Sequence, residues 1–141
     1  MSRKSKNTDS MVLSFDNIKK LANKNLVFRK AICKGAFSEL VVMSIPPWGE
    51  LGEEKHEKAD EILFIVDGKG KLILDGQTES AHKHDAIFVT AGQVHNLKNI
   101  GDGDLKIISV LSPPPPTGTD SSIHRTGAKD AEEHLRYLWE Q

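Results

Sequence analysis

The sequence has few of the features that anchor proteins in membranes or stabilise them outside the cell. Its 141 residues include one cysteine, Cys33, so no disulfide can form within the chain. Because small secreted domains are often disulfide-bonded, we expect a cytoplasmic protein. No apolar run approaches the about 18 residues of a membrane span, and Met1–Ser10 lacks the apolar stretch of a signal peptide. The hydrophobic fraction of 38% excludes disorder throughout and suits one globular domain.

Net charge is also nearly absent, but the formal value of −1 hides an uneven distribution. Residues 1–34 contain nine Lys and Arg against two acids, whereas residues 35–141 contain ten against eighteen acids. A basic segment can bind nucleic acid. No aromatic residue lies among the first ten residues to stack on bases, so we expect neither a nucleic-acid nor a membrane partner. Six acids fall between Glu50 and Glu61, and their mutual repulsion favours a positive charge nearby.

Changes of composition divide the chain into four segments. We expect a disordered basic arm over residues 1–12, a short helix within 13–25, a β-domain over 26–112, and a proline-rich exit with a closing helix over 113–141. In the second segment, Ser14 is placed to cap a helix over Phe15–Ala22. In the last segment, Pro113–Pro116 cannot donate to a strand ladder, and Ala128–Trp139 has the apolar spacing of a helix.

Short apolar runs separated by turn signals predict the β-domain. Asp75-Gly76 and Gly101-Asp102-Gly103 are two of these signals. No helical crossovers lie between the runs, which excludes a parallel α/β sheet and favours an all-β sandwich or barrel. The predicted strands are Leu26–Ile32, Phe37–Ile45, Glu53–Glu57, Glu61–Val66, Lys71–Leu74, Ala86–Thr90, Val94–Asn99 and Leu105–Leu111.

Four side chains of types that commonly bind metals lie in this β-domain: Glu54, His56, Glu61 and His95. Glu54 and His56 are two residues apart, so in a strand they point to the same face. A turn over residues 57–60 can bring Glu61 back beside them, and His95 begins a later strand. Two imidazoles and a carboxylate with open positions suit Fe(II), and the same set suits Mn, Ni or Zn. Surface strands also carry Glu and His at this spacing without a metal, and that alternative stays open here.

The surroundings of these four residues resemble the cupin superfamily, in particular its small bacterial single-domain members. The two cupin motifs are matched by Glu54-x-His56, four residues, Glu61, six residues and Gly68, and then by Gly92, two residues, His95, three residues and Asn99. The resemblance covers about residues 26–112. It implies an all-β fold built on a single jelly-roll β-barrel, to which the chain adds a short N-terminal helix and a C-terminal helix.

The resemblance also implies a metal site. His56, Glu61 and His95 would bind a divalent metal ion (Fe, Mn, Ni or Zn), with Glu54 as a fourth candidate ligand. The chain departs from the family at the first motif position, where Glu54 stands in place of His. Glu54 is therefore either a ligand or a catalytic general base beside the ion.

Two functions remain open at this stage, and so does the question of whether the chain is an enzyme. The family resemblance most often implies dioxygenase or isomerase chemistry on a small polar or carbonyl-bearing molecule inside the barrel. The altered first motif also fits a non-catalytic protein that binds a sugar or phenolic ligand with weak or no metal. The resemblance further implies a homodimer, formed through strands near the N-terminus.

Several other residues have ordinary structural explanations. His82 and His84 form a second His-x-His pair, which the polar residues around it place in an exposed turn rather than at a metal. Met43, Phe64 and Phe88 lie in predicted strands, and we expect them to face the hydrophobic core.

Overall fold

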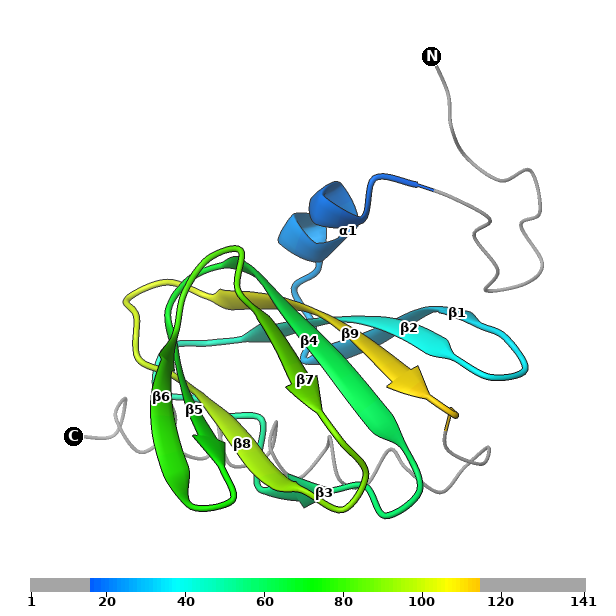
Figure 1. The fold of residues 1–141 in the computed structure, drawn as a ribbon. Helices are drawn as coiled ribbons and strands as arrows, with labels where there is room; N and C mark the ends of the chain where they lie inside the picture. The colour runs from blue at the N-terminus through cyan, green and yellow to red at the C-terminus, as the bar shows by residue number, and fades with distance from the viewer. Residues whose placement is uncertain (1–15, 115–141) are drawn as a thin grey trace.

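The computed structural model describes residues 16–114, which form one short helix and nine strands (Figure 1). The helix is α1 (Ile18–Lys24). The strands are β1 (Arg29–Lys34), β2 (Glu39–Ile45), β3 (Glu54–Lys55), β4 (Asp60–Asp67), β5 (Gly70–Leu74), β6 (Gln77–Ala81), β7 (Ala86–Val89), β8 (Val94–Asn99) and β9 (Leu105–Ser112). The predicted all-β class is therefore confirmed for this part of the chain.

The strands form two antiparallel sheets, one with the order β1-β2-β9-β4-β7 and the other with the order β3-β8-β5-β6. Within residues 16–114, no named strand of one sheet pairs with a strand of the other. The expected closed barrel is therefore wrong in this respect, because the two sheets face each other without closing. Two of the four edge strands are short: β3 has two residues and β7 has four, so these two edges offer little ladder for the other sheet to continue.

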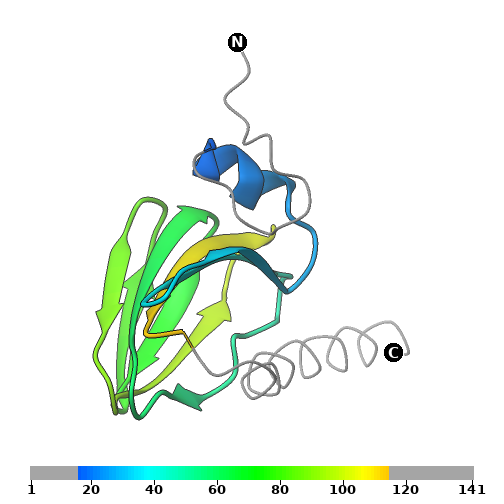
Figure 2. The same ribbon diagram turned by 90° about the vertical axis from the view of Figure 1, so that its right-hand side faces the viewer.

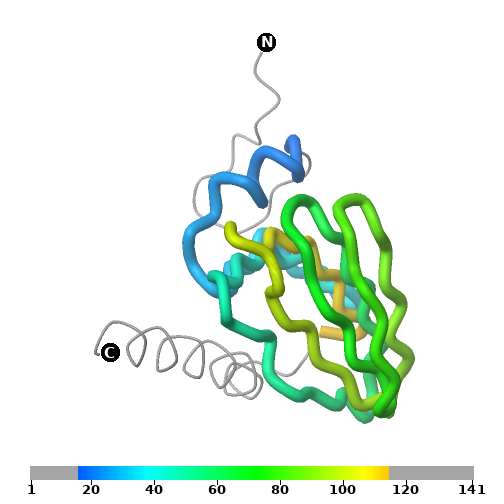
Figure 3. Tube along the Cα trace, turned by 90° about the vertical axis from the view of Figure 1, so that its left-hand side faces the viewer, coloured from blue at the N-terminus to red at the C-terminus, as the bar shows by residue number. Residues whose placement is uncertain are grey.

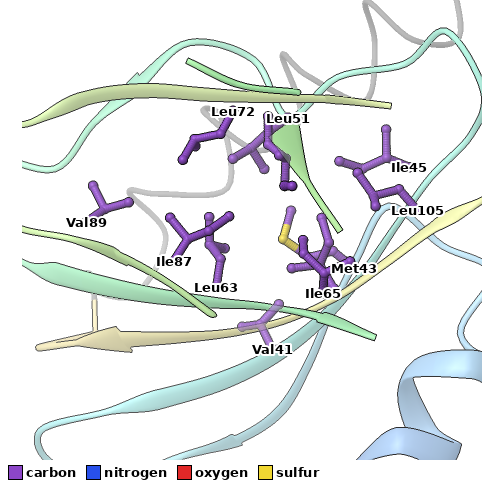
Figure 4. Close-up of a cluster of buried hydrophobic side chains, with 13 residues drawn as sticks. Val41, Met43, Ile45, Leu51, Leu63, Ile65, Leu72, Ile87, Val89 and Leu105 are labelled. Carbon is purple, nitrogen blue, oxygen red and sulfur yellow. The ribbon is translucent and has the colours of Figure 1, made fainter. Parts of the chain in front are cut away.

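The hydrophobic core lies between the two sheets. Figure 4 shows Val41, Met43 and Ile65 from one sheet pointing toward Leu72 from the other. Met43 is fully buried, as predicted. Inward and outward residues alternate along each strand, so a single inward position fixes the direction of its neighbours.

This alternation refines one expectation for the aromatic residues and corrects another. Leu63 and Ile65 of β4 point inward, so Phe64 between them points outward, where it is partly buried against the second hydrophobic cluster with Ala22 of α1. Phe88 of β7 also lies outside the core and is 57% exposed. Its partner across the strands is Ile62, which is 41% exposed. An apolar strip therefore runs over the outer face of the five-stranded sheet.

The helix α1 covers another part of that outer face. Figures 2 and 3 show it (blue) outside the two layers, viewed from opposite sides. Its residue Ala22 is buried against Val42 and Val66 of the sheet. The helix begins later than the predicted Phe15–Ala22, because the side chain of Asn17 accepts a hydrogen bond from the amide of Lys20 (3.0 Å) and acts as the N-cap.

Strand β6 was not predicted from the sequence. Its residues are polar and exposed up to Ala81, so it lacks the apolar run that identified the other strands. The Asp75-Gly76 turn before it was the available signal. Both residues have positive φ angles (48° and 82°), as a two-residue hairpin turn requires, and the turn folds β6 back onto β5.

Several expected features lie outside the described residues: the basic arm over residues 1–12, the cap at Ser14 and the closing helix Ala128–Trp139. In the part that the structure describes, no helix has the length and apolar character needed to cross a membrane.

Candidate metal centre

The four predicted metal-binding side chains come from both sheets. Glu54 of β3 lies directly opposite His95 of β8 in the four-stranded sheet. Glu61 comes from β4 of the facing sheet, and its side chain points inward between them. His56 follows β3, one residue beyond the end of that strand. The folding of the two sheets onto each other thus brings together side chains from three separate strands and one turn.

Hydrogen bonds between loops fix this arrangement. The amide of Gly92 donates to the carbonyl of His56 (2.8 Å), and the amide of Ala91 donates to the carboxylate of Asp60 (2.9 Å). Gly92 has a φ of 86°, a conformation that glycine adopts without strain. Because the turn before β8 is tied in this way to both ends of the β3–β4 connection, His56, Glu61 and His95 are held in register.

The ligand atoms converge on the carboxylate of Glu61. Its Oε1 is 3.1 Å from Nε2 of His95 and 3.5 Å from Nε2 of His56. The Nε2 of His56 is also 2.9 Å from Oε2 of Glu54. The centres of the two imidazole rings are 5.4 Å apart. All four side chains are at most 8% exposed, so the cluster is an internal one rather than a patch of surface acids.

Two further groups orient these side chains. Nδ1 of His95 donates to the carbonyl of Gln93 (3.2 Å), which leaves Nε2 to face the cluster. The hydroxyl of Ser109 donates to Oε2 of Glu61 (2.7 Å), which directs Oε1 toward the two histidines. Groups that hold metal ligands from behind in this manner fix the ligand orientation and tune the affinity of the site.

The charges in the cluster shift the pKa values of its members. Burial opposes the charged form of His56, but hydrogen bonds and charge interactions with Glu54 and Glu61 outweigh it and raise the pKa of His56 to about 10. Burial likewise opposes the charged form of His95, and Glu61 outweighs it and raises the pKa of His95. Burial acts to raise the pKa of Glu61, but hydrogen bonds from His56, His95 and Ser109 lower it below its usual range. The two imidazoles therefore keep their protons to higher pH, and Glu61 stays ionised to lower pH, than the same side chains would in water.

The dimensions of the cluster fit a single metal ion. One ligand atom from each of the four residues can be chosen so that all lie within 4.8 Å of one another. Metal bonds of about 2.0–2.2 Å to nitrogen and oxygen place the ligand atoms of one ion at most about 4.4 Å apart. A contraction of a few tenths of an ångström therefore suffices, and two nitrogen and two oxygen ligands would leave positions open on a six-coordinate ion.

All four residues singled out from the sequence lie in this cluster, but Asn99 of the second motif does not. It is at the other end of β8, where its side-chain amide donates to the carbonyls of Ile45 and Gly103 (2.8 Å each). The sequence reasoning missed Ser109. The available signal was a single polar residue at an inward-facing position of β9, between Ile107 and Leu111.

The remaining histidine pair is separate from the cluster. His82 and His84 lie in the exposed turn between β6 and β7, in agreement with the expectation. The amide of His82 donates to the carboxylate of Asp85 (2.7 Å), and the ring of His84 stacks on Phe64. His124 and His134 lie outside the described residues.

Comparisons with known proteins identify the family. A family model of the cupin domain matches residues 41–111. An uncharacterized protein of Bacillus subtilis, YrkC, is 32% identical over 120 residues, which are 79% of this chain and 62% of that protein. The oxalate-binding protein of Thermotoga maritima is 32% identical over 69 residues, which are 49% of this chain and 57% of that protein. The chain thus spans about three fifths of the length of these relatives.

A solved structure gives the same result for the fold. The crystal structure of BH2720 from Bacillus halodurans aligns with a TM-score of 0.71 and 30% identity, covering 74% of this chain and 85% of that one. The predicted resemblance is therefore confirmed, and the chain belongs to the cupin family.

Proposed function

We propose that the chain binds one divalent metal ion through His56, Glu61 and His95, with Glu54 as a fourth ligand or as a general base beside the ion, and that it acts on a small polar or carbonyl-bearing molecule at this ion. The observation that supports the proposal is the convergence of four buried ligand side chains within 4.8 Å of one another. Buried ionisable groups are expensive unless they are paired or bind a metal. Fe, Mn, Ni and Zn all suit imidazole and carboxylate ligands.

The reaction class we propose is that of a dioxygenase or an isomerase. A bound ion would act as a Lewis acid that polarises a carbonyl or enol oxygen of the substrate. Within the protein, Gln93 and Ser109 hold His95 and Glu61 in place. Where Glu54 does not bind the ion, its carboxylate lies beside the site as a general base that accepts a proton from the substrate.

Metal analysis tests this proposal directly. The purified protein is stripped with a chelator and then titrated separately with Fe(II), Mn(II), Ni(II) and Zn(II). We expect binding of one ion per chain and an increase of the melting temperature, because a ligand that binds the folded state alone stabilises it. The combined absence of stoichiometric binding and of a thermal shift with all four ions would contradict the proposal.

One observation supports a second candidate, a non-catalytic cupin that binds a sugar or phenolic ligand with weak or no metal. The side chains of the cluster already contact one another: Glu61 accepts hydrogen bonds from His95 and Ser109, and its Oε1 lies 3.5 Å from Nε2 of His56. Such a network can persist without an ion. The double variant His56→Ala/His95→Ala separates the two candidates. Ligand binding that survives the loss of metal supports the second, and ligand binding that disappears with the metal supports the first.

We also propose that the chain forms a homodimer through the outer face of its five-stranded sheet. Four apolar residues stand in register across this face: Leu40, Val110, Ile62 and Phe88. Phe88 and Ile62 are 57% and 41% exposed, and contiguous exposed apolar surface of this kind marks interaction sites. Sedimentation of Phe88→Lys tests the proposal, with Ile100→Lys, a 55% exposed residue between β8 and β9, as the control. We expect the first variant alone to be monomeric, and a monomeric unmodified chain would contradict the proposal.

A further inference from the structure

A groove of about 1060 Å³ opens at the end of the molecule opposite the candidate metal centre. Its walls are the β2–β3 connection, the β4–β5 turn, the β6–β7 turn and the β8–β9 loop. His95 of the metal centre lies near the start of β8, whereas the groove begins beyond the end of that strand. Figure 1 shows the β4–β5 and β6–β7 turns at the end of the strands away from β3, which carries Glu54. The groove is therefore separate from the proposed metal site.

The largest side chain of this groove, Trp48, occupies a backbone position that favours glycine. The amide of Gly49 donates to the carbonyl of Pro46 (2.9 Å), which closes a turn with Pro47 and Trp48 at its centre. Trp48 has a φ of 70°, a value typical of the third position of a type II turn, where glycine or asparagine is usual. The indole is also 68% exposed, so burial in the core does not offset the strain of this conformation. Strained residues of this kind are common at binding sites.

A second exposed apolar side chain, Ile100, belongs to the same groove and is 55% exposed. Backbone hydrogen bonds hold it near Trp48. The amide of Asn99 donates to the carbonyl of Gly49 (2.9 Å), and the amide of Ile100 donates to the carbonyl of Lys69 (3.1 Å). These bonds tie the β2–β3 connection, the end of β8 and the β4–β5 turn together. The groove is thus formed before any ligand binds.

Charged groups of both signs surround the two apolar side chains. The carboxylates of Asp67, Asp102 and Asp104 offer hydrogen-bond acceptors, and the ammonium groups of Lys69 and Lys83 offer donors. Lys83 lies 4.0 Å from Asp67, so part of this charge is paired across two turns. Three carboxylates and two lysines nearly balance. Neither a phosphate group nor a polycation therefore meets a strong field of the opposite sign in this groove.

We propose that the groove binds a neutral oligosaccharide, with one sugar ring stacked on the indole of Trp48 and its hydroxyls bonded to the charged side chains around it. One face of a sugar ring presents C–H groups, which are attracted to the electron-rich face of an aromatic ring. A hydroxyl both donates and accepts, so it can bond to a carboxylate and an ammonium group at once. The volume of about 1060 Å³ slightly exceeds the about 300–1,000 Å³ of small-molecule pockets and suits a chain of several sugars.

The lining of the groove favours a sugar over a peptide. An extended peptide gains affinity by adding a strand to the edge of a sheet. The edge strands of the two described sheets are β1, β7, β3 and β6, and none of them contributes a residue to the groove. A helical peptide lays an apolar face into an apolar groove. Here Trp48 and Ile100 lie among charged groups, which suit the hydroxyls of a sugar instead.

Calorimetric titration of the unmodified protein with four neutral hexasaccharides tests the proposal: cellohexaose, maltohexaose, mannohexaose and xylohexaose. The anionic hexagalacturonate is the charged comparison. We expect at least one neutral hexasaccharide to bind with a dissociation constant below about 1 mM, and at least tenfold more tightly than hexagalacturonate. Binding of hexagalacturonate within tenfold of the best neutral sugar would overturn the inference. Failure of all four neutral sugars would overturn it in favour of a protein partner, since tryptophan is also common at protein interfaces.

The variant Trp48→Gly separates a binding role from a structural one. Glycine adopts the φ of this position without strain, so the variant should melt at no lower a temperature than the unmodified protein. We expect its affinity for the best hexasaccharide to fall at least tenfold. An unchanged affinity would overturn the inference, and so would a lower melting temperature, because the indole would then serve the fold.

The matched control is Phe37→Ala, which removes another aromatic side chain. Phe37 is 81% exposed and lies between β1 and β2, outside the groove. Its removal should leave the affinity for the hexasaccharide within twofold of the unmodified value. A loss as large as that of Trp48→Gly would overturn the inference.

A last comparison separates the groove from the metal centre. The double variant His56→Ala/His95→Ala should bind the hexasaccharide within twofold of the unmodified protein, because both histidines lie at the other end of the molecule. Sugar binding that persists in Trp48→Gly and disappears in the double variant would place the sugar at the metal centre and overturn the inference. The proposed metal site does not depend on either result.

Discussion

Strand β8 carries a buried polar residue near each end, and the two differ in what they bind. His95 is 1% exposed and Asn99 is 4% exposed. Asn99 bonds to backbone groups alone, with its amide donating to Ile45 and Gly103 and its oxygen accepting from Gly101 (2.9 Å). His95 directs its Nε2 to another ionisable side chain, Glu61. We call the Asn99 end the structural end of the strand, and the His95 end, which belongs to the candidate metal centre, its reactive end.

The comparison shows how to distinguish structural from functional buried polar groups. A side chain that satisfies the backbone cannot bind a ligand unless the fold opens, because each backbone group it left would be buried without a partner. A side chain that bonds to other ionisable side chains can exchange them for an ion without moving the backbone. Both residues belong to the second cupin motif, so the motif combines one residue of each kind.

The largest effect is expected at the reactive end. Glu61→Gln replaces a charged ligand by a neutral one of the same shape, so the fold should persist. Metal affinity should fall by more than about 100-fold, since the loss of groups behind the ligands alone costs about 10–100-fold. Calorimetric titration measures the affinity, and circular dichroism checks the fold. The matched control is the exposed Glu57→Gln, and an unchanged affinity for Glu61→Gln would show that this carboxylate is not a ligand.

The structural end should respond in the opposite way. Asn99→Ala removes the partners of three backbone groups, and each buried group left unsatisfied costs about 1–3 kcal/mol. Because water can reach some of them, we expect the free energy of unfolding to fall by about 2–3 kcal/mol. Metal affinity should stay within about threefold of the unmodified value.

Asn23→Ala is the matched control for this variant, since it removes the same side chain from an exposed position of α1. Urea denaturation of the metal-free proteins gives the stability. If Asn99→Ala lowered metal affinity as strongly as Glu61→Gln does, the division between the two ends would be wrong.

The two ends should also differ in their dependence on pH, because ionisable groups cluster at one of them. The pKa of His56 is raised from 6.5 to about 10, so its contribution to stability is fully present below pH 6.5 and is lost as the pH rises toward 10. The pKa of Glu61 is lowered from 4.5, so its contribution is present above pH 4.5 and is lost as the pH falls through more acidic values.

The cluster should therefore stabilise the metal-free protein most between about pH 4.5 and 6.5. Urea denaturation at pH 5.5, 7, 8.5 and 10 in the presence of a chelator measures this. With metal the trend should reverse above pH 6.5, because deprotonated imidazoles are the form that binds the ion. A metal-free stability that stays level from pH 6 to 9 would mean that the histidines are not held by the carboxylates.

The sequence predicted which side chains come together at the reactive end, because their spacing is largely local and such a set of residue types is unusual. Val94–Asn99 was predicted with the observed bounds, and Glu54, His56 and Glu61 were identified from their spacing. The supporting Ser109 was not, since its role depends on a strand that is far away in the sequence but adjacent in the sheet. The outward direction of Phe88 was missed for a similar reason: alternation gives two faces, and only the tertiary pairing shows which one is covered.

The smallest effect on metal affinity and stability is expected for Ser109, which supports both the candidate metal centre and the fold. Its hydroxyl donates to Oε2 of Glu61 (2.7 Å) and is buried in the core face of β9. Ser109→Ala should lower metal affinity about tenfold, because Glu61 loses the group that orients it. It should also lower the free energy of unfolding by about 1 kcal/mol. The control is Ser112→Ala at the exposed end of the same strand, which removes a hydroxyl that bonds to the hydroxyl of Ser38. It should change neither the metal affinity nor the free energy of unfolding appreciably.

The relative size of the two losses in Ser109→Ala, in metal affinity and in the free energy of unfolding, shows whether Ser109 serves mainly the metal centre or mainly the fold. A loss of affinity without a loss of stability would place Ser109 entirely with the metal ligands. A loss of stability without a loss of affinity would place it with Asn99, as a residue that serves the fold. The expected result, a small loss of both, follows from its position, since Ser109 bonds to Glu61, a proposed ligand of the ion, while its strand β9 joins β2 and β4 in the centre of the five-stranded sheet.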